Sequence, residues 1–156
     1  YNLFKSARIV MQGITGINEK VRLKMTISSQ AFCANSVNYC TFKNHEDIYY
    51  FLGIFNSKLL NYIFKQFSTN SNVNGYEIDN LPIIIAEDKN IISNLTKKVL
   101  KAKEDGQDTL NDESAIDFQV YKLYGLTYVE VCIVDPETPI TREEYEDREK
   151  NSYISH

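Results

Sequence analysis

Hydrophobic and polar positions alternate with a period of two in the first third of the chain. Residues 7–12 and 21–27 show the pattern most cleanly. A period of two is typical of a β-strand with one buried face. Residues 13–18 contain two glycines and an asparagine and predict the loop between these two strands. Shorter β-type runs follow at residues 31–34 and 37–42.

The spacing of apolar residues changes to three and four after Asn44. It predicts one amphipathic helix over residues 47–67, with the apolar positions Ile48, Phe51, Leu52, Phe55, Leu59, Tyr62, Ile63 and Phe67. Residues 68–75 are rich in Asn and Ser and predict a surface loop. Residues 76–86 then predict a β-segment, with Pro82 at an edge or bulge.

The remainder of the chain predicts further helices. One amphipathic helix ends near Gly106 and another ends at Gly125. Capping boxes are predicted to start short helices at Thr127 and Thr141. The whole pattern predicts an α+β fold. In it a twisted, mainly antiparallel sheet from residues 1–86 packs on the long amphipathic helix and is followed by C-terminal helices.

The length of 156 residues, with 43% apolar positions, fits one domain with a short appendage. No apolar run approaches the roughly 18 residues that cross a bilayer, and no basic-then-apolar leader opens the chain. We therefore expect a soluble, cytoplasmic protein with no membrane partner. Because the sequence starts at Tyr1 without Met, we expect a fragment of a longer polypeptide.

The cysteines and histidines argue against a disulfide framework and a zinc site. Cys33, Cys40 and Cys132 are odd in number and form no C-x-x-C pair, as expected for reduced core thiols. His45 and His156 are the only histidines, so zinc has too few ligands at suitable spacing. We predict no metal or cofactor site in this chain.

The net charge of −4 is unevenly distributed along the chain. Residues 1–86 hold eight basic and five acidic side chains, a balance of +3, whereas residues 87–156 hold nine basic and sixteen acidic ones, a balance of −7. An anionic partner would therefore meet the first half, although an acidic, solvated helical tail explains the same split.

No catalytic constellation emerges from the sequence. It has no G-x-G-x-x-G or G-K-[ST] motif and no N-P-P-[YF] tetrapeptide of amino-methyltransferases. No His stands where it would serve as a base beside a Ser or Cys nucleophile. Glu77 and Asp79 would share one face of a strand and are candidate metal carboxylates of a nuclease. A strand border is the simpler interpretation of these two acids.

The polar residues of the first half are instead suited to DNA. Asn and Gln read adenine, Arg and Lys read guanine, and basic side chains also neutralise phosphates. Arg8, Gln12, Arg22 and Lys24 alternate with core residues, so we expect them to point outward. The predicted contacts to phosphates or guanines are Arg8, Arg22, Lys24 and Lys65. The predicted contacts near bases are Gln12, Asn35, Asn38, Asn72 and Asn74.

Several segments, in this order, resemble the TaqI-like C-terminal specificity domain. Residues 7–16 (ARIVMQGITG), 22–26 (RLKMT) and 35–38 (NSVN) are similar to its opening strands. The sequence YFLGIFNSKLLNYIFK at residues 50–65 resembles its leucine-rich helix followed by Asn-Ser-Lys. The sequence NGYEIDNLP at residues 74–82 resembles the strand that follows, and residues 116–134, which include YKLYGL at residues 121–126, resemble the closing helix.

The resemblance implies target recognition for a type IIG restriction enzyme or an adenine-N6 DNA methyltransferase. Double-stranded DNA is then the partner, together with an upstream methyltransferase or nuclease domain of the same polypeptide. That parent would use S-adenosylmethionine, with Mg²⁺ as a further candidate, while this chain needs no catalytic residue. We place the recognition domain at residues 1–135 and an acidic helical tail at residues 136–156. Two alternatives stay open: a docking module of a phage-defence system, and a metal-dependent nuclease fragment.

Overall fold

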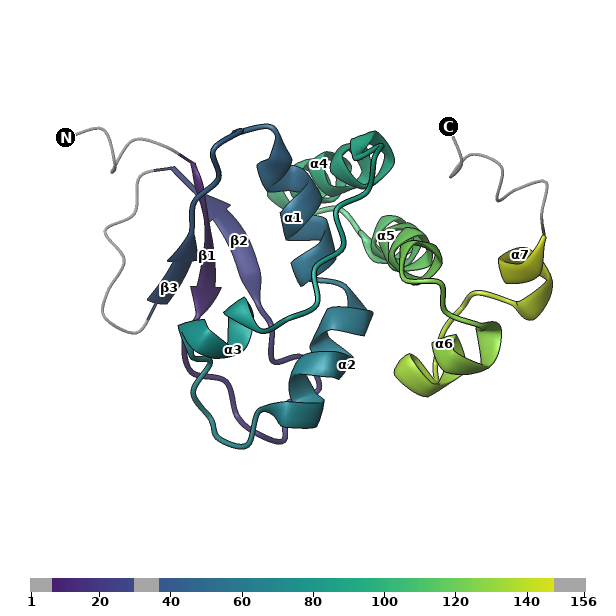
Figure 1. Ribbon diagram of the computed structural model, residues 1–156. Helices are drawn as coiled ribbons and strands as arrows, with labels where there is room; N and C mark the ends of the chain where they lie inside the picture. Colours follow the sequence, from purple (N-terminus) through teal and green to yellow (C-terminus); the bar gives the residue numbers. More distant parts are fainter. Residues whose placement is uncertain (1–6, 30–36, 148–156) are drawn as a thin grey trace.

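The computed structural model describes residues 7–29 and 37–147, and its sheet has three strands in the order β2-β1-β3 (Figure 1). These strands are β1 (Arg8–Gln12), β2 (Met25–Ser28) and β3 (Val37–Cys40). Both neighbours run antiparallel to β1, with Ile9 opposite Ile27 on one side and opposite Cys40 on the other. The predicted strand over residues 21–27 is therefore shorter and begins only at Met25.

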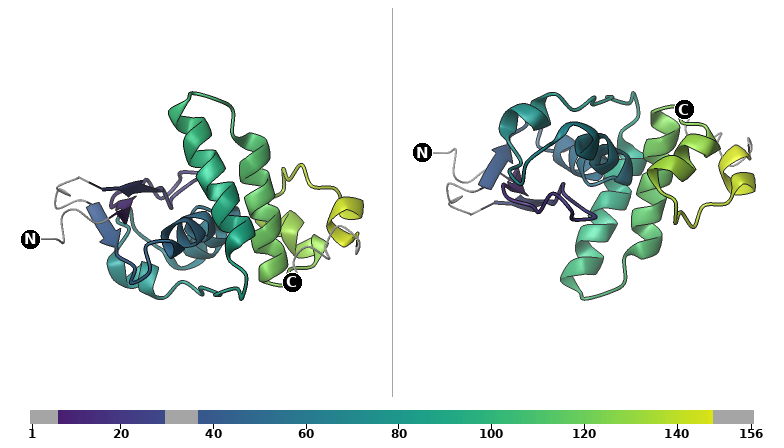
Figure 2. Two further views of the ribbon diagram at one scale, coloured as in Figure 1. Left: turned by 90° about the horizontal axis from the view of Figure 1, so that it is seen from above. Right: turned by 90° about the horizontal axis from the view of Figure 1, so that it is seen from below.

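The sheet packs its core face against α1 (Asp47–Phe55), the first helix of the chain. Ile9 and Met11 alternate along β1 and are almost completely buried on that face. Gln12 and Thr26 are exposed on the opposite face, which no helix of the described residues covers (Figure 2). The alternation of the sequence thus identifies the buried face of β1 correctly.

The helix predicted over residues 47–67 is two helices, α1 and α2 (Lys58–Phe67), with a break between them. Ser57 ends the first helix and starts the second, because its hydroxyl donates to Ile54 O (2.7 Å) and accepts from the Leu60 N–H (3.3 Å). A serine that caps a new helix offers the backbone an alternative to a continuous helix. The prediction of one long helix is wrong at this point.

The β-segment predicted over residues 76–86 is also wrong. Its first residues form the short helix α3 (Gly75–Asp79), and no strand follows it within the described residues. Asn74 and Glu77 make a capping box, in which each side chain satisfies a backbone N–H of the other residue. The chain after Asp79 crosses α1, where the Tyr50 hydroxyl donates to Ile84 O (2.8 Å).

The second half of the described chain is helical, as expected. It contains α4 (Asn90–Glu104), α5 (Leu110–Leu123), α6 (Tyr128–Val134) and α7 (Arg142–Glu146). The helices form successive layers beside the sheet, with α1 and α2 next to it, then α4 and α5, and α6 and α7 at the far end (Figures 1 and 2). A small antiparallel sheet with many helices confirms the α+β class.

Sequence signals for helix ends are confirmed in this half. Gly106 and Gly125 follow α4 and α5 with φ of 69° and 67°, a left-handed conformation that glycine adopts without steric cost. Thr127 and Thr141 cap α6 and α7 through capping boxes. These local signals are reliable because each depends only on neighbouring residues.

The contact between α1 and α4 is tight at Gly53. A Cβ atom there would lie 2.5 Å from Thr96 Oγ1 and 2.8 Å from Ile92 Cγ2. The Thr96 hydroxyl is itself fixed, because it donates to Ile92 O (2.8 Å). The absence of a side chain at Gly53 therefore sets how closely the two helices approach.

Two buried carboxylates join the α5 and α6 end of the chain to the start of α2. Asp117 Oδ1 accepts the backbone N–H of Lys58 (2.9 Å), and Asp135 Oδ2 pairs with Lys58 Nζ (2.7 Å). Burial, the largest cause, raises the pKa of Asp117 to about 7. The Tyr121 hydroxyl is buried among the described residues without a hydrogen-bond partner, and burial raises its pKa as well.

The domain boundary after Asp135 stays a prediction. Beyond it, Ile140 and Tyr145 are buried and belong to the main hydrophobic cluster. The Tyr145 hydroxyl donates to Leu126 O (2.6 Å), which links α7 to the loop before α6. The part of the proposed tail that the structure describes therefore packs on the preceding helices.

Candidate nucleic-acid interface

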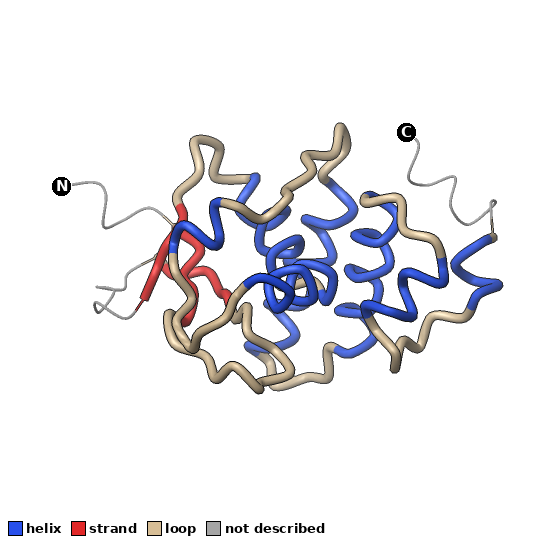
Figure 3. The backbone as a smooth tube through the Cα atoms, turned by 60° about the horizontal axis from the view of Figure 1, so that its bottom comes forward, coloured by secondary structure: helices blue, strands red, loops and turns tan. Residues whose placement is uncertain are grey.

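Two loops meet beyond one end of the sheet. Residues 13–24 (loop A) connect β1 to β2, and residues 68–74 (loop B) connect α2 to α3 (Figures 1 and 3). The Thr15 N–H donates to Ser71 O (2.8 Å), and the Val73 N–H donates to Gly13 O (2.8 Å). An antiparallel bridge between Ile14 and Asn72 completes the contact. We call this unit the paired loops.

Arg22 lies inside the paired loops and not on the surface. Its side chain is only 1% exposed, so the expected outward orientation of Arg22 is wrong. Nε donates to Thr15 Oγ1 (3.3 Å), Nη1 to Ser68 Oγ (2.9 Å) and Nη2 to Asn70 O (2.6 Å). Its guanidinium also stacks 5.0 Å from the centre of the Phe64 ring. Strand alternation fails here because β2 begins three residues later.

The polar side of α1 and α2 covers the free edge of β2 and the end of loop A. Asn56 makes two hydrogen bonds to the backbone of Met25, accepting its N–H (3.1 Å) and donating to its carbonyl (2.9 Å). Asn61 Oδ1 accepts the Arg22 N–H (2.8 Å), while its Nδ2 donates to Lys20 O (2.9 Å). The two amides replace a neighbouring strand and satisfy backbone groups that an edge would leave open.

Two lysines of the predicted set gather at Glu19 in loop A. Lys24 Nζ forms an ion pair with the Glu19 carboxylate, and Lys65 Nζ donates to the Glu19 carbonyl (3.1 Å). The hydrogen bond and charge of Lys24 lower the pKa of Glu19. Lys24 and Lys65 are exposed, so their outer sides face solvent.

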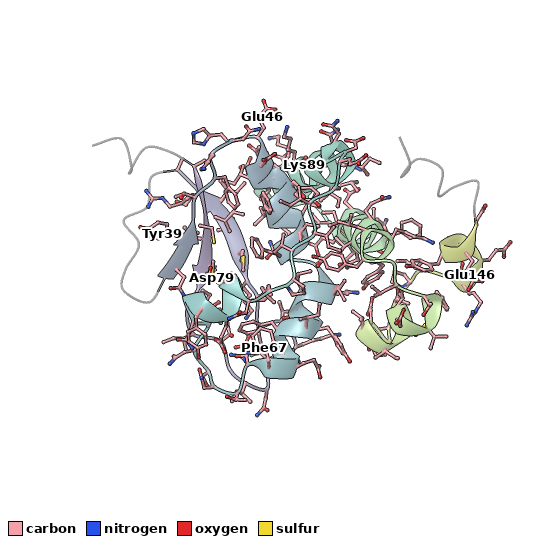
Figure 4. The ribbon with its side chains drawn as sticks, in the orientation of Figure 1. Tyr39, Glu46, Phe67, Asp79, Lys89 and Glu146 are labelled. Carbon is pink, nitrogen blue, oxygen red and sulfur yellow. The ribbon has the colours of Figure 1, made fainter. Side chains whose placement is uncertain are left out.

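Arg8 lies at the other end of β1, away from the paired loops. As the alternation predicts, it is on the face of β1 opposite to Ile9 and Met11, but it is only 6% exposed, and its guanidinium lies 5.1 Å from the centre of the Tyr39 ring. Figure 4 shows Tyr39 on β3 and Phe67 at the end of α2 nearest the paired loops. Arg8 therefore does not join the other predicted contacts.

Two predicted base-reading side chains support the loops from the sheet. Gln12, at the end of β1, is exposed as expected and donates through Nε2 to Ile14 O (2.8 Å) in loop A. Asn38 on β3 donates through Nδ2 to Val73 O (2.6 Å) in loop B. The amide nitrogen of each side chain therefore already donates a hydrogen bond to the backbone of a loop.

Asn72 is the predicted base contact that is both exposed and on the surface of loop B. Its N–H donates to Asn70 Oδ1 (2.9 Å), a turn that fixes the backbone at this residue. Asn74 is partly buried and caps α3 together with Glu77. Asn35 lies outside the residues that the structure describes.

The carboxylates considered for a nuclease do not converge. Glu77 is 4% exposed, and its Oε2 accepts the Asn74 N–H (2.9 Å). Because residues 77 and 79 lie on a helix and not on a strand, two steps along the chain turn Asp79 away from Glu77. No group of three His, Cys, Asp or Glu side chains in residues 7–29 and 37–147 could hold a metal ion.

The Cys40 thiol lies beside α3, in a partly buried position. Burial, and to a lesser degree the negative charge of Asp79, raises the pKa of Cys40. A protonated thiol is a poor nucleophile. Cys40, Asn38 and Asp79 line a shallow hollow of about 280 Å³ between β3 and α3.

Sequence reasoning missed two features of this region. It assigned no role to Asn56 and Asn61, whose side chains bond the backbone of the β2 edge and of loop A. It also left out the exposed apolar side chains of loop A, which are Ile14 (57%), Ile17 (45%) and Val21 (46%). The available signal was the presence of two isoleucines, each directly after a glycine, in a predicted loop.

Comparison with family models, curated proteins and solved structures finds no match. The helices of the described residues include none that is long and apolar enough to cross a membrane.

Proposed function

We propose that this chain recognises a DNA target within a restriction and modification enzyme or an adenine-N6 DNA methyltransferase. The paired loops face the duplex, and a catalytic domain of the same polypeptide, using S-adenosylmethionine, acts on the adenine. The observation that carries the proposal is the convergence of Gln12, Arg22, Asn38 and Asn72 at one end of the sheet. The resemblance of the sequence to specificity domains supports it independently.

The surface of the paired loops offers the groups that base edges require. Loop B exposes the amides of Asn70 and Asn72, and an amide side chain can bond adenine with two hydrogen bonds. Ile14 exposes apolar surface of the kind that contacts thymine methyl groups. Lys24 and Lys65 flank the loops at hydrogen-bonding distance from Glu19, which a phosphate would replace as their partner.

One observation favours docking as the second candidate function. Val129 (58%) and Ile133 (57%) are exposed one turn apart on α6, so they form a short apolar stripe on this helix. The segment that follows α6 is joined to loop A by an ion pair between Glu137 and Lys20 (2.7 Å). The nuclease alternative gains no comparable support, because the Glu77 carboxylate is engaged in capping α3.

The test is a binding titration of the whole 156-residue chain with fluorescent duplex DNA over a range of KCl concentrations. The double variant Lys24→Gln and Lys65→Gln should bind more weakly. It should also lower the slope of log K against log salt by about two, because each lost phosphate contact removes about 0.9. The matched control is Lys98→Gln with Lys101→Gln, two exposed, ion-paired lysines on α4.

The control pair should leave the salt slope unchanged, since α4 lies away from the paired loops (Figure 1). An equal loss of slope in both double variants would contradict the assignment of the paired loops. Failure of the wild-type chain to bind duplex even at about 50 mM salt would contradict DNA binding altogether. Docking through α6 would then be the better hypothesis.

A further inference from the structure

Arg22 is a buried charge whose observed acceptors are all neutral. Among the described residues no carboxylate forms an ion pair with it; its hydrogen bonds go to Thr15 Oγ1, Ser68 Oγ and O, and Asn70 O. Removing a guanidinium from water costs several kcal/mol unless hydrogen bonds compensate it. Well-packed apolar residues often stabilise a protein as much as a buried charge does, or more. We therefore look for the role of Arg22 in the directions of its hydrogen bonds and not in stability.

The geometry is that of a clamp between the two loops. Nε reaches loop A at Thr15, whereas Nη1 and Nη2 reach loop B at Ser68 and Asn70. A planar guanidinium fixes the directions of these bonds at once, which the point charge of a lysine cannot do. The side chain therefore fixes loop A and loop B relative to each other.

The clamp is anchored on the body of the fold. The backbone N–H of Arg22 donates to Asn61 Oδ1 on α2, and the Phe64 ring of the same helix lies under the guanidinium. Both contacts come from a helix that is buried against the rest of the molecule through Leu60 and Phe64. The position of the paired loops is thus set by α2, through Arg22.

A short chain of hydrogen bonds leads from the clamp to the exposed amide of loop B. Arg22 Nη2 donates to the Asn70 carbonyl (2.6 Å), and Asn70 Oδ1 accepts the N–H of Asn72 (2.9 Å). The Asn72 backbone also bridges Ile14 of loop A. Asn72 is therefore fixed by two contacts, one to Asn70 in loop B and one to Ile14 in loop A. Both contacts depend on the relative position of the two loops.

We propose that Arg22 is a positioning residue that sets the sequence preference of the paired loops without touching DNA. The inference rests on the proposed function. A side chain that reads a base edge must be held within a fraction of an ångström, so a loosened frame loses discrimination before it loses general affinity. Non-specific attraction to phosphates depends on exposed lysines, and Arg22 is not exposed.

The test compares Arg22→Lys with the wild-type chain on two duplexes. One is the duplex that the wild-type chain enriches from a random-sequence pool, and the other is a scrambled duplex of equal length. Arg22→Lys should reduce the affinity ratio of the two by about tenfold or more and change binding to the scrambled duplex by less than about threefold. Gly53→Ala, which strains the distant α1 and α4 contact, controls for general destabilisation and should keep the ratio.

Amide hydrogen exchange provides a second measurement on Arg22→Lys, which reports how firmly the two loops are paired. The N–H groups of Thr15 and Val73 cross between the loops and should exchange faster in Arg22→Lys than in Gly53→Ala. Thr15→Val removes one acceptor and keeps the arginine, so it should shift both measurements in the same direction by less. It also keeps the test decisive if Arg22→Lys does not fold.

The outcomes separate the inference from the proposed function. If the wild-type chain discriminates and the variants discriminate equally well, Arg22 does not set specificity and the inference is overturned alone. Unchanged exchange at Thr15 and Val73 also overturns it, because the clamp would not hold the loops. If the wild-type chain prefers no duplex, the proposed function fails and the inference fails with it.

Discussion

The buried carboxyl of Asp117 makes the stability of this protein depend on pH in a direction that can be stated in advance. Its side chain is 6% exposed, and burial is the largest cause of a pKa of about 7 in place of 3.8. The negative charges of Asp135 and Glu113 also raise the pKa, while the N–H and the charge of Lys58 lower it. Burial prevails because one backbone N–H and one partly exposed ammonium do not replace the water around a carboxylate.

The sign follows from proton linkage. Between pH 4 and pH 7 the folded protein holds a proton on Asp117 that the unfolded chain has released, so the free energy of unfolding falls as pH rises through this window. Above pH 7 Asp117 is ionised in both states, and the loss of stability from burying its charge has reached its full size. A shift from 3.8 to about 7 spans about three units, and at about 1.4 kcal/mol per unit the penalty reaches about 4 kcal/mol.

The perturbation is Asp117→Asn, which stays neutral at every pH and keeps an oxygen to accept the Lys58 N–H. Its free energy of unfolding relative to the wild type should rise between pH 4 and pH 8 by up to about 4 kcal/mol. Urea unfolding at several pH values measures this difference. Asp105→Asn, an exposed carboxylate on the end of α4, controls for the loss of one negative charge.

A difference between Asp117→Asn and wild type that does not change with pH would refute the reasoning. So would a variant that becomes less stable than the wild type as pH rises, because the carboxylate would then be the favoured form. The same change in Asp105→Asn would assign the effect to net charge and not to burial.

Two further changes test the packing. Gly53→Ala places a Cβ 2.5 Å from Thr96 Oγ1 and should lower the free energy of unfolding in urea by about 1–3 kcal/mol. Gly75→Ala, whose Cβ would meet nothing within 4 Å, should lower it by less, and equal losses in the two variants would contradict the tight contact. Asn56→Ala leaves the N–H and the carbonyl of Met25 without their partners and should lower the free energy of unfolding by about 1–3 kcal/mol. Hydrogen exchange of the Met25 amide should also become faster, and unchanged exchange would show that Asn56 does not protect the strand edge.

Local signals in the sequence predict much of the fold. The buried face of β1, the capping boxes of α6 and α7 and the glycines that end α4 and α5 all follow from residues next to each other in the chain. The break at Ser57 escaped prediction because apolar spacing continues across it, since α1 and α2 both bury residues in the same core. A capping serine within a helical pattern was the available signal.

The candidate site was predictable in part. Gln12, Asn38 and Asn72 are indeed near one another, although their sequence positions alone do not say that loops A and B pair. Arg22 was misplaced because an alternating pattern was extended before the first residue of β2. The contacts that bury it come from Ser68 and Asn70, more than forty residues away, and a local pattern carries no information about such distant partners.

The affinity of the whole chain for duplex DNA, measured as the salt concentration is varied, tests the proposed DNA interface most directly. Binding should weaken steeply as KCl rises, and the double change of Lys24 and Lys65 to Gln should lower the salt slope by about two. The same change at Lys98 and Lys101 should leave the slope as it is. No binding at low salt, or the same slope for all three proteins, would contradict the assignment of the paired loops as a DNA interface.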